Sequence, residues 1–222
     1  FGPDKYIWQI HSSNDDRVHS FTVRRTSDYE ELGCAVYRED VKQYFYSPVR
    51  GSFDECQIDK SGQWLLIKEH LDKGSKGEDN LIVNVTTGAE TILLDKNGAG
   101  GHSDNGFGVM IAADDANNLP NVLRLWTFGP ASLAPGPVVY RDPQWLPQSM
   151  QHVSFANARA GPMTQQYACG SGASRKNGPR ANEVVCFVLD GSLRTLVVAP
   201  VMTDLTAPGG VDDYARAPKG NL

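Results

Sequence analysis

The fold is decided by the stretch Cys56-Gln-Ile-Asp-Lys-Ser-Gly-Gln-Trp-Leu-Leu-Ile-Lys-Glu69, in which two β-rich runs flank the turn Asp59-Lys-Ser-Gly62. After a polar loop come Asp79-Asn-Leu-Ile-Val-Asn-Val-Thr-Thr-Gly88 and then Ala89-Glu-Thr-Ile-Leu-Leu-Asp95. Apolar and β-branched residues dominate each run, and turn-forming residues bound it, which is the pattern of short β-strands. The order is therefore strand, loop, a strand that ends in a Thr-Gly turn, and a third strand.

The same order recurs three more times along the chain. The other copies run over residues 5–39, 108–140 and 165–199, and the second strands of the four copies begin near residues 18, 81, 122 and 183. Repeats of about 45 residues with variable loops fit the four-stranded blades of a β-propeller. A further segment precedes each of the last three copies and would supply the innermost strand of its blade: 53–58, 102–107 and 152–156.

We therefore predict an all-β chain that forms a β-propeller of four-stranded antiparallel blades. An immunoglobulin-type sandwich is the alternative, because it also has many short strands, but it does not explain one strand order four times over. The approximate units are 1–50, 51–98, 99–147 and 148–205, with 206–222 leading into a further blade. Four blades alone would leave two exposed sheet edges and an open channel, so we expect an incomplete part of a propeller with roughly six to eight blades.

Composition narrows the classes of function. The chain is 40% hydrophobic, and 21 basic against 26 acidic residues give a net charge of −5 with no block of like charge. The sequence therefore lacks the cluster of basic residues that is typical of nucleic-acid-binding proteins. The apolar run Leu196–Met202 is far shorter than a membrane-spanning helix, so we predict no transmembrane segment.

The turn Asp59-Lys-Ser-Gly62 with its following apolar strand resembles the Asp-x-x-Gly-x-x-hydrophobic turn of TolB-type propeller repeats. The wider pattern looks like a family of secreted bacterial propeller proteins that has no established activity. The segments that carry this wider resemblance are Asp54–Gly62, Gly101–Gly108, Arg180–Phe187, Ala199–Leu205 and Pro218–Leu222. The resemblance implies a propeller fold and a secreted or periplasmic location.

The cysteines bear on the redox compartment. Cys169 and Cys186 fall in consecutive predicted strands of one blade, about equidistant from a loop at Asn177-Gly178. Facing positions in an antiparallel hairpin bring Cβ atoms within bridging distance, so this pair is the candidate disulfide. Cys34 and Cys56 lie across a blade-to-blade connection, where pairing is less secure. The alternative is four buried free thiols in a cytosolic protein, whereas a bridge indicates maturation outside the reducing cytosol.

The candidate functional residues are Glu55, His102, Asp104 and His152, one or two at the start of each predicted innermost strand. We expect them to gather at one mouth of the channel. Imidazoles and carboxylates can ligate a first-row divalent metal, and carboxylates alone can hold calcium. The alternative is structural, because buried polar groups also cap strands and form hydrogen bonds between blades.

Two functions follow from these residues and this fold. The first is an extracellular or periplasmic propeller that acts as a binding or scaffold module for a protein or polysaccharide partner. The second is a carbohydrate-active enzyme of the polysaccharide-lyase type, with a metal-assisted site at the central channel. We assign no catalytic residue and no cofactor beyond a candidate divalent cation. A cation bound by His102 and His152 would favour the enzyme, whereas a channel filled by hydrophobic side chains or water would favour the binding module.

Overall fold

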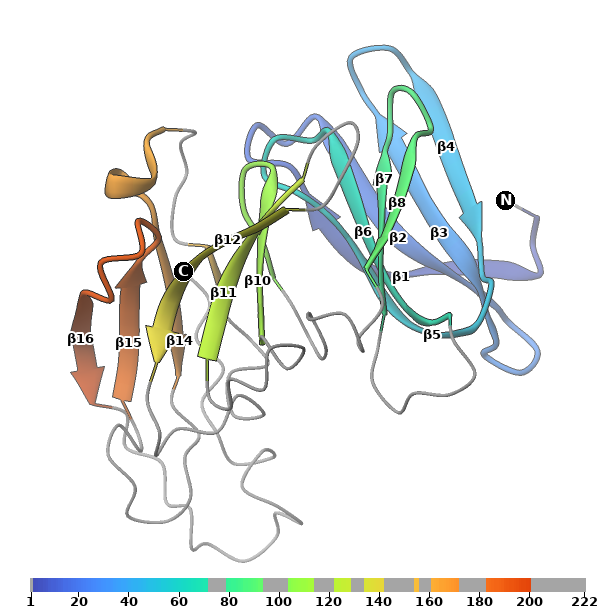
Figure 1. Ribbon diagram of the computed structural model, residues 1–222. Helices are drawn as coiled ribbons and strands as arrows, with labels where there is room; N and C mark the ends of the chain where they lie inside the picture. The colour runs from blue at the N-terminus through green and yellow to red at the C-terminus, as the bar shows by residue number, and fades with distance from the viewer. Residues whose placement is uncertain are drawn as a thin grey trace, which may run out of the picture.

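A computed structural model describes residues 2–71, 79–93, 104–113, 122–128, 134–141, 154–155, 161–171 and 183–200. The described chain consists of β-strands apart from one short 3-10 turn, η3, at Met163–Gln165. The strands form four separate sheets of four strands each, which follow one another along the chain (Figure 1). We number these sheets blade 1 to blade 4 in chain order.

Every blade is an antiparallel meander whose strand order in space equals the order in sequence. Blade 1 contains β1 Lys5–Ser12, β2 Val18–Arg25, β3 Glu31–Arg38 and β4 Gln43–Pro48. Blade 2 contains β5 Ser52–Ile58, β6 Trp64–His70, β7 Asp79–Asn84 and β8 Glu90–Leu93. Blade 3 contains β9 Asp104–Asn105, β10 Val109–Ala113, β11 Val122–Thr127 and β12 Ala134–Arg141. Blade 4 contains β13 Ser154–Phe155, β14 Tyr167–Ser171, β15 Glu183–Val188 and β16 Thr195–Pro200.

The first strand of each blade is the innermost one. Strand β1 contacts β5, and β9 contacts β13. Between blades 2 and 3, the Asn105 side-chain amide at the end of β9 donates to the Gln57 carbonyl oxygen of β5, at 3.0 Å. These contacts place β1, β5, β9 and β13 next to one another, and the predicted all-β fold of four-stranded antiparallel blades is confirmed.

The alignment of the first repeat is wrong by one strand. The first runs of the last three copies, which begin at residues 64, 109 and 167, are the second strands of their blades. The first run of copy 1, residues 5–11, is instead β1, the innermost strand of its blade, and β4 is not among the predicted strands. The true second strands begin at residues 18, 64, 109 and 167. Most residues of β4 are exposed, so this outermost strand lacks the apolar signal that reveals the buried strands.

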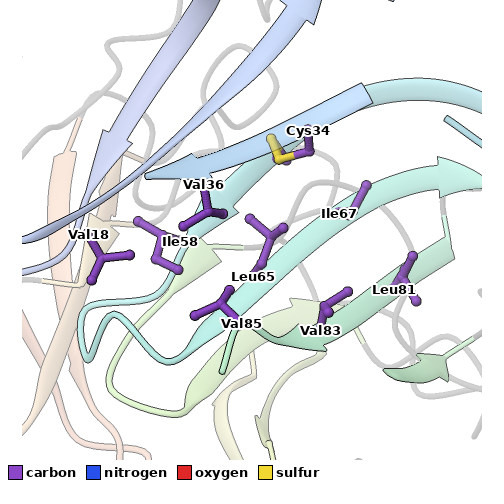
Figure 2. Packing of buried hydrophobic residues seen from close by; sticks show 10 residues of the cluster. Val18, Cys34, Val36, Ile58, Leu65, Ile67, Leu81, Val83 and Val85 are labelled. Carbon is purple, nitrogen blue, oxygen red and sulfur yellow. A yellow bond between two sulfur atoms is a disulfide. The ribbon is translucent and has the colours of Figure 1, made fainter. Parts of the chain in front are cut away.

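Side chains from both faces of blade 2 form the cores that join it to its neighbours. Leu65 and Ile67 of β6 face blade 1, where they pack with Val18 and Val36 (Figure 2). Leu66 of β6 belongs to a second core, shared with blade 3, that includes Trp64, Ile82, Met110, Trp126 and Phe128. A third core joins blades 3 and 4 through residues that include Leu125, Tyr140, Phe187 and Leu189. Alternate residues of one strand thus serve two different interfaces, as the period of two in a β-strand requires.

Two disulfides are present in the described chain. Cys169 and Cys186 face each other in the ladder of β14 and β15 and form the predicted bridge within blade 4. Cys34 of β3 is bonded to Cys56 of β5, so this second bridge links blade 1 covalently to blade 2. Both sulfurs of the second bridge lie in the fully buried core between the two blades.

We expect removal of the bridge between blades to loosen one interface specifically. The double substitution Cys34→Ala/Cys56→Ala opens a loop with a sequence separation of 22 residues, which lowers the free energy of unfolding by about 3 kcal/mol in the chain-entropy model. Hydrogen exchange should then accelerate in β3 and β5. The matched control, Cys169→Ala/Cys186→Ala, should accelerate exchange in β14 and β15 instead. Unchanged protection of β3 and β5 in the first variant would contradict the bridging role.

Candidate functional site

The turn between β5 and β6 is organised by the carboxylate of Asp59. Its Oδ1 accepts hydrogen bonds from the backbone N–H groups of Gln63 and Trp64, at 3.0 and 2.9 Å. Its Oδ2 accepts from the Ser61 hydroxyl at 2.6 Å and from the Gly108 N–H of blade 3 at 2.8 Å. The resembled Asp-x-x-Gly turn therefore does more than close a hairpin, because its carboxylate also holds the neighbouring blade.

Glycine is required at the last position of this turn. Gly62 has a φ of +72°, in the left-handed region, and a Cβ there would lie 2.8 Å from a methyl group of Val18 in blade 1. Any other residue would destabilise the fold, both because its side chain disfavours this backbone conformation and because its Cβ would clash with Val18. The turn is thus fitted between blades 1 and 3.

Backbone hydrogen bonds connect the corresponding turns of three blades. The Asn14 N–H of blade 1 donates to the Lys60 carbonyl at 3.0 Å, and the Lys60 N–H donates to the Gly106 carbonyl of blade 3 at 2.9 Å. The Ile58 N–H also donates to the Ser20 hydroxyl of blade 1, at 2.8 Å. These bonds hold the ends of β1, β5 and β9 at one level, where they position the polar side chains of the innermost strands.

Substitution of Asp59 tests this role. Burial raises the pKa of Asp59, and the hydrogen bonds from Ser61, Trp64 and Gly108 oppose that shift. We expect Asp59→Ala to lower the free energy of unfolding by about 2–4 kcal/mol, because several buried donors lose a charged acceptor. The matched control is Asp15→Ala in the corresponding turn of blade 1, whose side chain is largely exposed. Chemical denaturation measures both changes, and equal effects of the two substitutions would contradict a special role for Asp59.

Glu55 belongs to a polar group on strands β5 and β6 of blade 2. It faces Lys68 in the ladder of β5 and β6 and forms an ion pair with the Lys68 ammonium group. The Gln57 side-chain amide donates to the same Glu55 oxygen at 3.0 Å. Lys68 is a charged residue with only 1% of its surface exposed, so the Glu55 carboxylate supplies the compensation that a buried cation needs.

His11 of β1 lies within the electrostatic reach of this ion pair. Burial lowers the pKa of His11, Glu55 raises it, and Lys68 and Lys60 lower it further. A neutral imidazole is therefore favoured on the innermost strand of blade 1, close to the charged pair of blade 2. We define His11, Glu55 and Lys68 together as the inner-strand polar cluster.

Only part of the predicted channel site falls on residues that the structure describes. Glu55 lies in the inner-strand polar cluster, and the backbone of Asp104 pairs with Ile111 at the start of β9. His102 and His152 lie outside the described residues, so the meeting of the four side chains stays a prediction. In the part of the chain that the structure describes, no group of three or more His, Cys, Asp or Glu side chains is arranged to hold a metal ion.

Sequence reasoning missed His11 and Lys68. Lys68 carries a recognisable signal, because it is the one charged residue in the run Trp64–Lys68 and such a residue needs a partner. The partner becomes evident only from the register of β5 and β6, which pairs Glu55 with Lys68 across a bulge. His11 carried no comparable signal, since the first repeat was aligned one strand out of place.

A titration of His11 checks the composition of the inner-strand polar cluster. We expect its imidazole to titrate below the usual range for histidine, because burial disfavours the charged form. Lys60→Gln should move the pKa of His11 upward, since it removes a nearby positive charge. The control substitution Lys42→Gln lies in the exposed β3–β4 turn and should leave it unchanged. NMR observation of the imidazole measures both, and a downward shift in Lys60→Gln would contradict the arrangement.

Blade 1 also carries a group of aromatic rings beside the turn that joins β2 to β3. This blade 1 aromatic patch consists of Tyr6, Trp8 and Tyr29, and the side chains of Trp8 and Tyr29 are 50% and 66% exposed. The rings of Tyr6 and Tyr29 meet edge to face with centroids 6.2 Å apart. The Arg24 guanidinium lies 5.5 Å from the centre of the Trp8 ring and forms an ion pair with Glu31.

A β-bulge follows Trp8 in β1. Trp8 pairs with Thr22 and His11 with Ser20, so two residues of β1 between them have no place in the ladder. One of these, Gln9, has a φ of +47°, which is uncommon for a residue other than glycine. Bulges bend a strand and redirect its side chains, and they are frequent beside binding sites.

Comparisons with known proteins bear on the fold. No protein-family model matches the chain, and no curated protein sequence matches it. The β-propeller domain of the Trilobed protease from Pyrococcus furiosus, described as having an open velcro topology, is similar with a TM-score of 0.53 at 7% identity. That match covers 90% of this chain and 59% of the other.

Two further solved structures are similar. One comes from an analysis of two prolyl endopeptidases and has a TM-score of 0.50 at 11% identity, covering 89% of this chain and 34% of that one. The other, TolB from Acinetobacter baumannii, has a TM-score of 0.42 at 11% identity, covering 89% of this chain and 55% of that one. The chain thus spans less than two thirds of the length of each of these three structures. Together with the four blades, the similarity to the β-propeller domain of the Trilobed protease shows a β-propeller fold. Among the described residues, no helix is long and apolar enough to cross a membrane.

Proposed function

We propose that the chain is part of an extracellular or periplasmic β-propeller that acts as a binding or scaffold module for a protein or polysaccharide partner. The observation that carries this proposal is the blade 1 aromatic patch. Large aromatic side chains that stay exposed on an ordered sheet are typical of interaction surfaces, where Trp, Tyr and Arg supply much of the binding energy. The patch contains Trp and Tyr, and Arg24 lies against its Trp8 ring.

The rigidity of blade 1 supports this role. The blade is joined to blade 2 by the Cys34–Cys56 bridge, by a buried core and by the hydrogen bond from Ile58 to Ser20. A surface that is already ordered loses little conformational entropy when a partner binds. The two disulfides also support a location outside the reducing cytosol, where such bonds form and persist.

The inner-strand polar cluster favours the binding module over the metal-assisted enzyme. The Glu55 carboxylate already compensates the buried Lys68 ammonium group and accepts a hydrogen bond from Gln57. A metal ion at Glu55 would have to compete with that ammonium group and would leave it uncompensated. The enzyme would therefore depend on the histidines His102 and His152 for most of its ligands.

One set of measurements separates the two functions. Affinity electrophoresis of the full chain in gels that contain pectate, alginate, xylan or dextran measures polysaccharide binding, and titration with synthetic basic, acidic and aromatic peptides measures peptide binding. The same polysaccharides are assayed for new reducing ends with calcium and with EDTA. We expect binding to at least one probe and no new reducing ends. Binding to none of them would contradict the proposal, and calcium-dependent cleavage would replace it with the enzyme.

A further inference from the structure

We infer that the blade 1 aromatic patch binds a basic, lysine- or arginine-rich peptide segment of a protein partner. This inference rests on the proposed function and names the chemistry of the partner. It depends on how the charged residues around the three rings are arranged.

Acidic side chains outnumber basic ones around the patch. The acidic residues are Asp4, Asp28, Glu30 and Glu31, and the basic residues are Lys5, Arg24 and Arg25. Each basic group is already paired, Lys5 with Asp4, Arg24 with Glu31, and Arg25 with both Asp28 and Glu30. Each of these three positive charges is therefore already compensated by a carboxylate, which disfavours binding of an anionic partner.

The acidic groups also lie farther toward solvent than the basic groups. The side chain of Asp4 is 62% exposed against 33% for its partner Lys5. The side chain of Glu30 is 58% exposed against 38% for its partner Arg25. Arg24, the least exposed of the three bases, lies against the Trp8 ring. A partner would thus meet aromatic rings surrounded by carboxylates. We call these carboxylates, those of Asp4, Asp28, Glu30 and Glu31, the acidic rim.

Two carboxylates of this surface, Asp4 and Asp28, have a lowered pKa, which favours their charged form. Hydrogen bonds from Lys5 lower the pKa of Asp4, and those from the Glu30 N–H and Arg25 lower the pKa of Asp28. Exposed aromatic faces attract ammonium and guanidinium groups, and neighbouring carboxylates attract the same groups. Lysine and arginine side chains satisfy both features at once, whereas an acidic peptide would be repelled by the rim.

The backbone holds the most exposed ring in place before a partner arrives. Tyr29 has a φ of +63°, its N–H donates to the Arg25 carbonyl at 3.0 Å, and its ring packs on Tyr6. Both exposed rings are thus ordered by contacts within blade 1, Tyr29 by the Tyr6 ring and Trp8 by the Arg24 guanidinium.

The test uses the full chain and two capped octapeptides without aromatic residues, one composed of Lys, Arg and Gly and the other of Glu and Gly. We expect the basic peptide to bind, with an affinity that falls as salt is raised, and the acidic peptide not to bind. Isothermal titration calorimetry measures affinity, and the shift of the Trp8 indole N–H signal in NMR spectra, assigned with Trp8→Phe, locates the contact.

Three variants assign the binding to the patch. Tyr29→Asn removes the ring but keeps a residue that tolerates the left-handed backbone, and it should weaken binding roughly threefold to tenfold. Glu30→Gln/Glu31→Gln should weaken binding at least as much. The matched control Glu39→Gln/Asp40→Asn changes the net charge by the same amount in the β3–β4 turn, at the other end of the blade, and should leave the affinity unchanged.

Thermal melts establish that the variants are folded. No binding of the basic peptide, equal binding of the acidic peptide, or equal weakening by the control pair would each overturn the inference. These results are distinguishable from failure of the proposed function, because a chain that binds a polysaccharide or another peptide but ignores the basic one is still a binding module. A chain that binds no probe at all fails both.

Discussion

Burial of both faces of blade 2 is the constraint on which the rest of the described structure depends. Strands β6 and β7 are buried at nearly every position because one face packs on blade 1 and the other on blade 3. Water does not reach polar groups inside a sheet that is covered on both sides, so these groups need hydrogen-bond partners within the protein. The buried charged residues of β6 and β7 therefore have partners: Lys68 pairs with Glu55, Glu69 accepts from the N–H groups of Arg50 and Gly51, and Asp79 accepts from the Leu71 N–H.

The same constraint explains why residues in the turns are needed to fix neighbouring blades relative to one another. Flat hydrophobic faces allow adjacent sheets to slide, since the hydrophobic effect has no direction. Directional bonds at the edges remove that freedom. Asp59 joins blade 2 to blade 3, the Lys60 backbone joins three blades, and the Cys34–Cys56 bridge fixes blade 1 to blade 2. The level of the innermost strands, and hence the position of His11 relative to Glu55, follows from these bonds.

The sequence predicts the parts of this structure that repeat or that depend on local chemistry. Four copies of one strand order predict the blades, and the Asp59–Gly62 turn and the facing positions of Cys169 and Cys186 follow from residues close in sequence. Strand β4 escapes prediction because its exposed residues show no apolar pattern. The Glu55–Lys68 pair escapes because it depends on a bulge in β5, and the contact of Arg24 with Trp8 depends on the register of β1 and β2. A single sequence does not specify either register.

Under the proposed function, blade 1 combines stability and recognition in one sheet. Its face toward blade 2 contributes small, fully buried residues such as Cys34 and Val36, which need close complementarity. The end beside the β2–β3 turn instead contributes large rings and ion pairs, for which partial exposure costs little, because aromatic side chains keep an apolar body and a polar tip. The ion pairs serve there as supports, since surface pairs of this kind add little stability. The contact of Arg24 with Trp8 therefore matters mainly because it orders the ring, and under the proposed function an ordered ring loses less conformational entropy when a partner covers it.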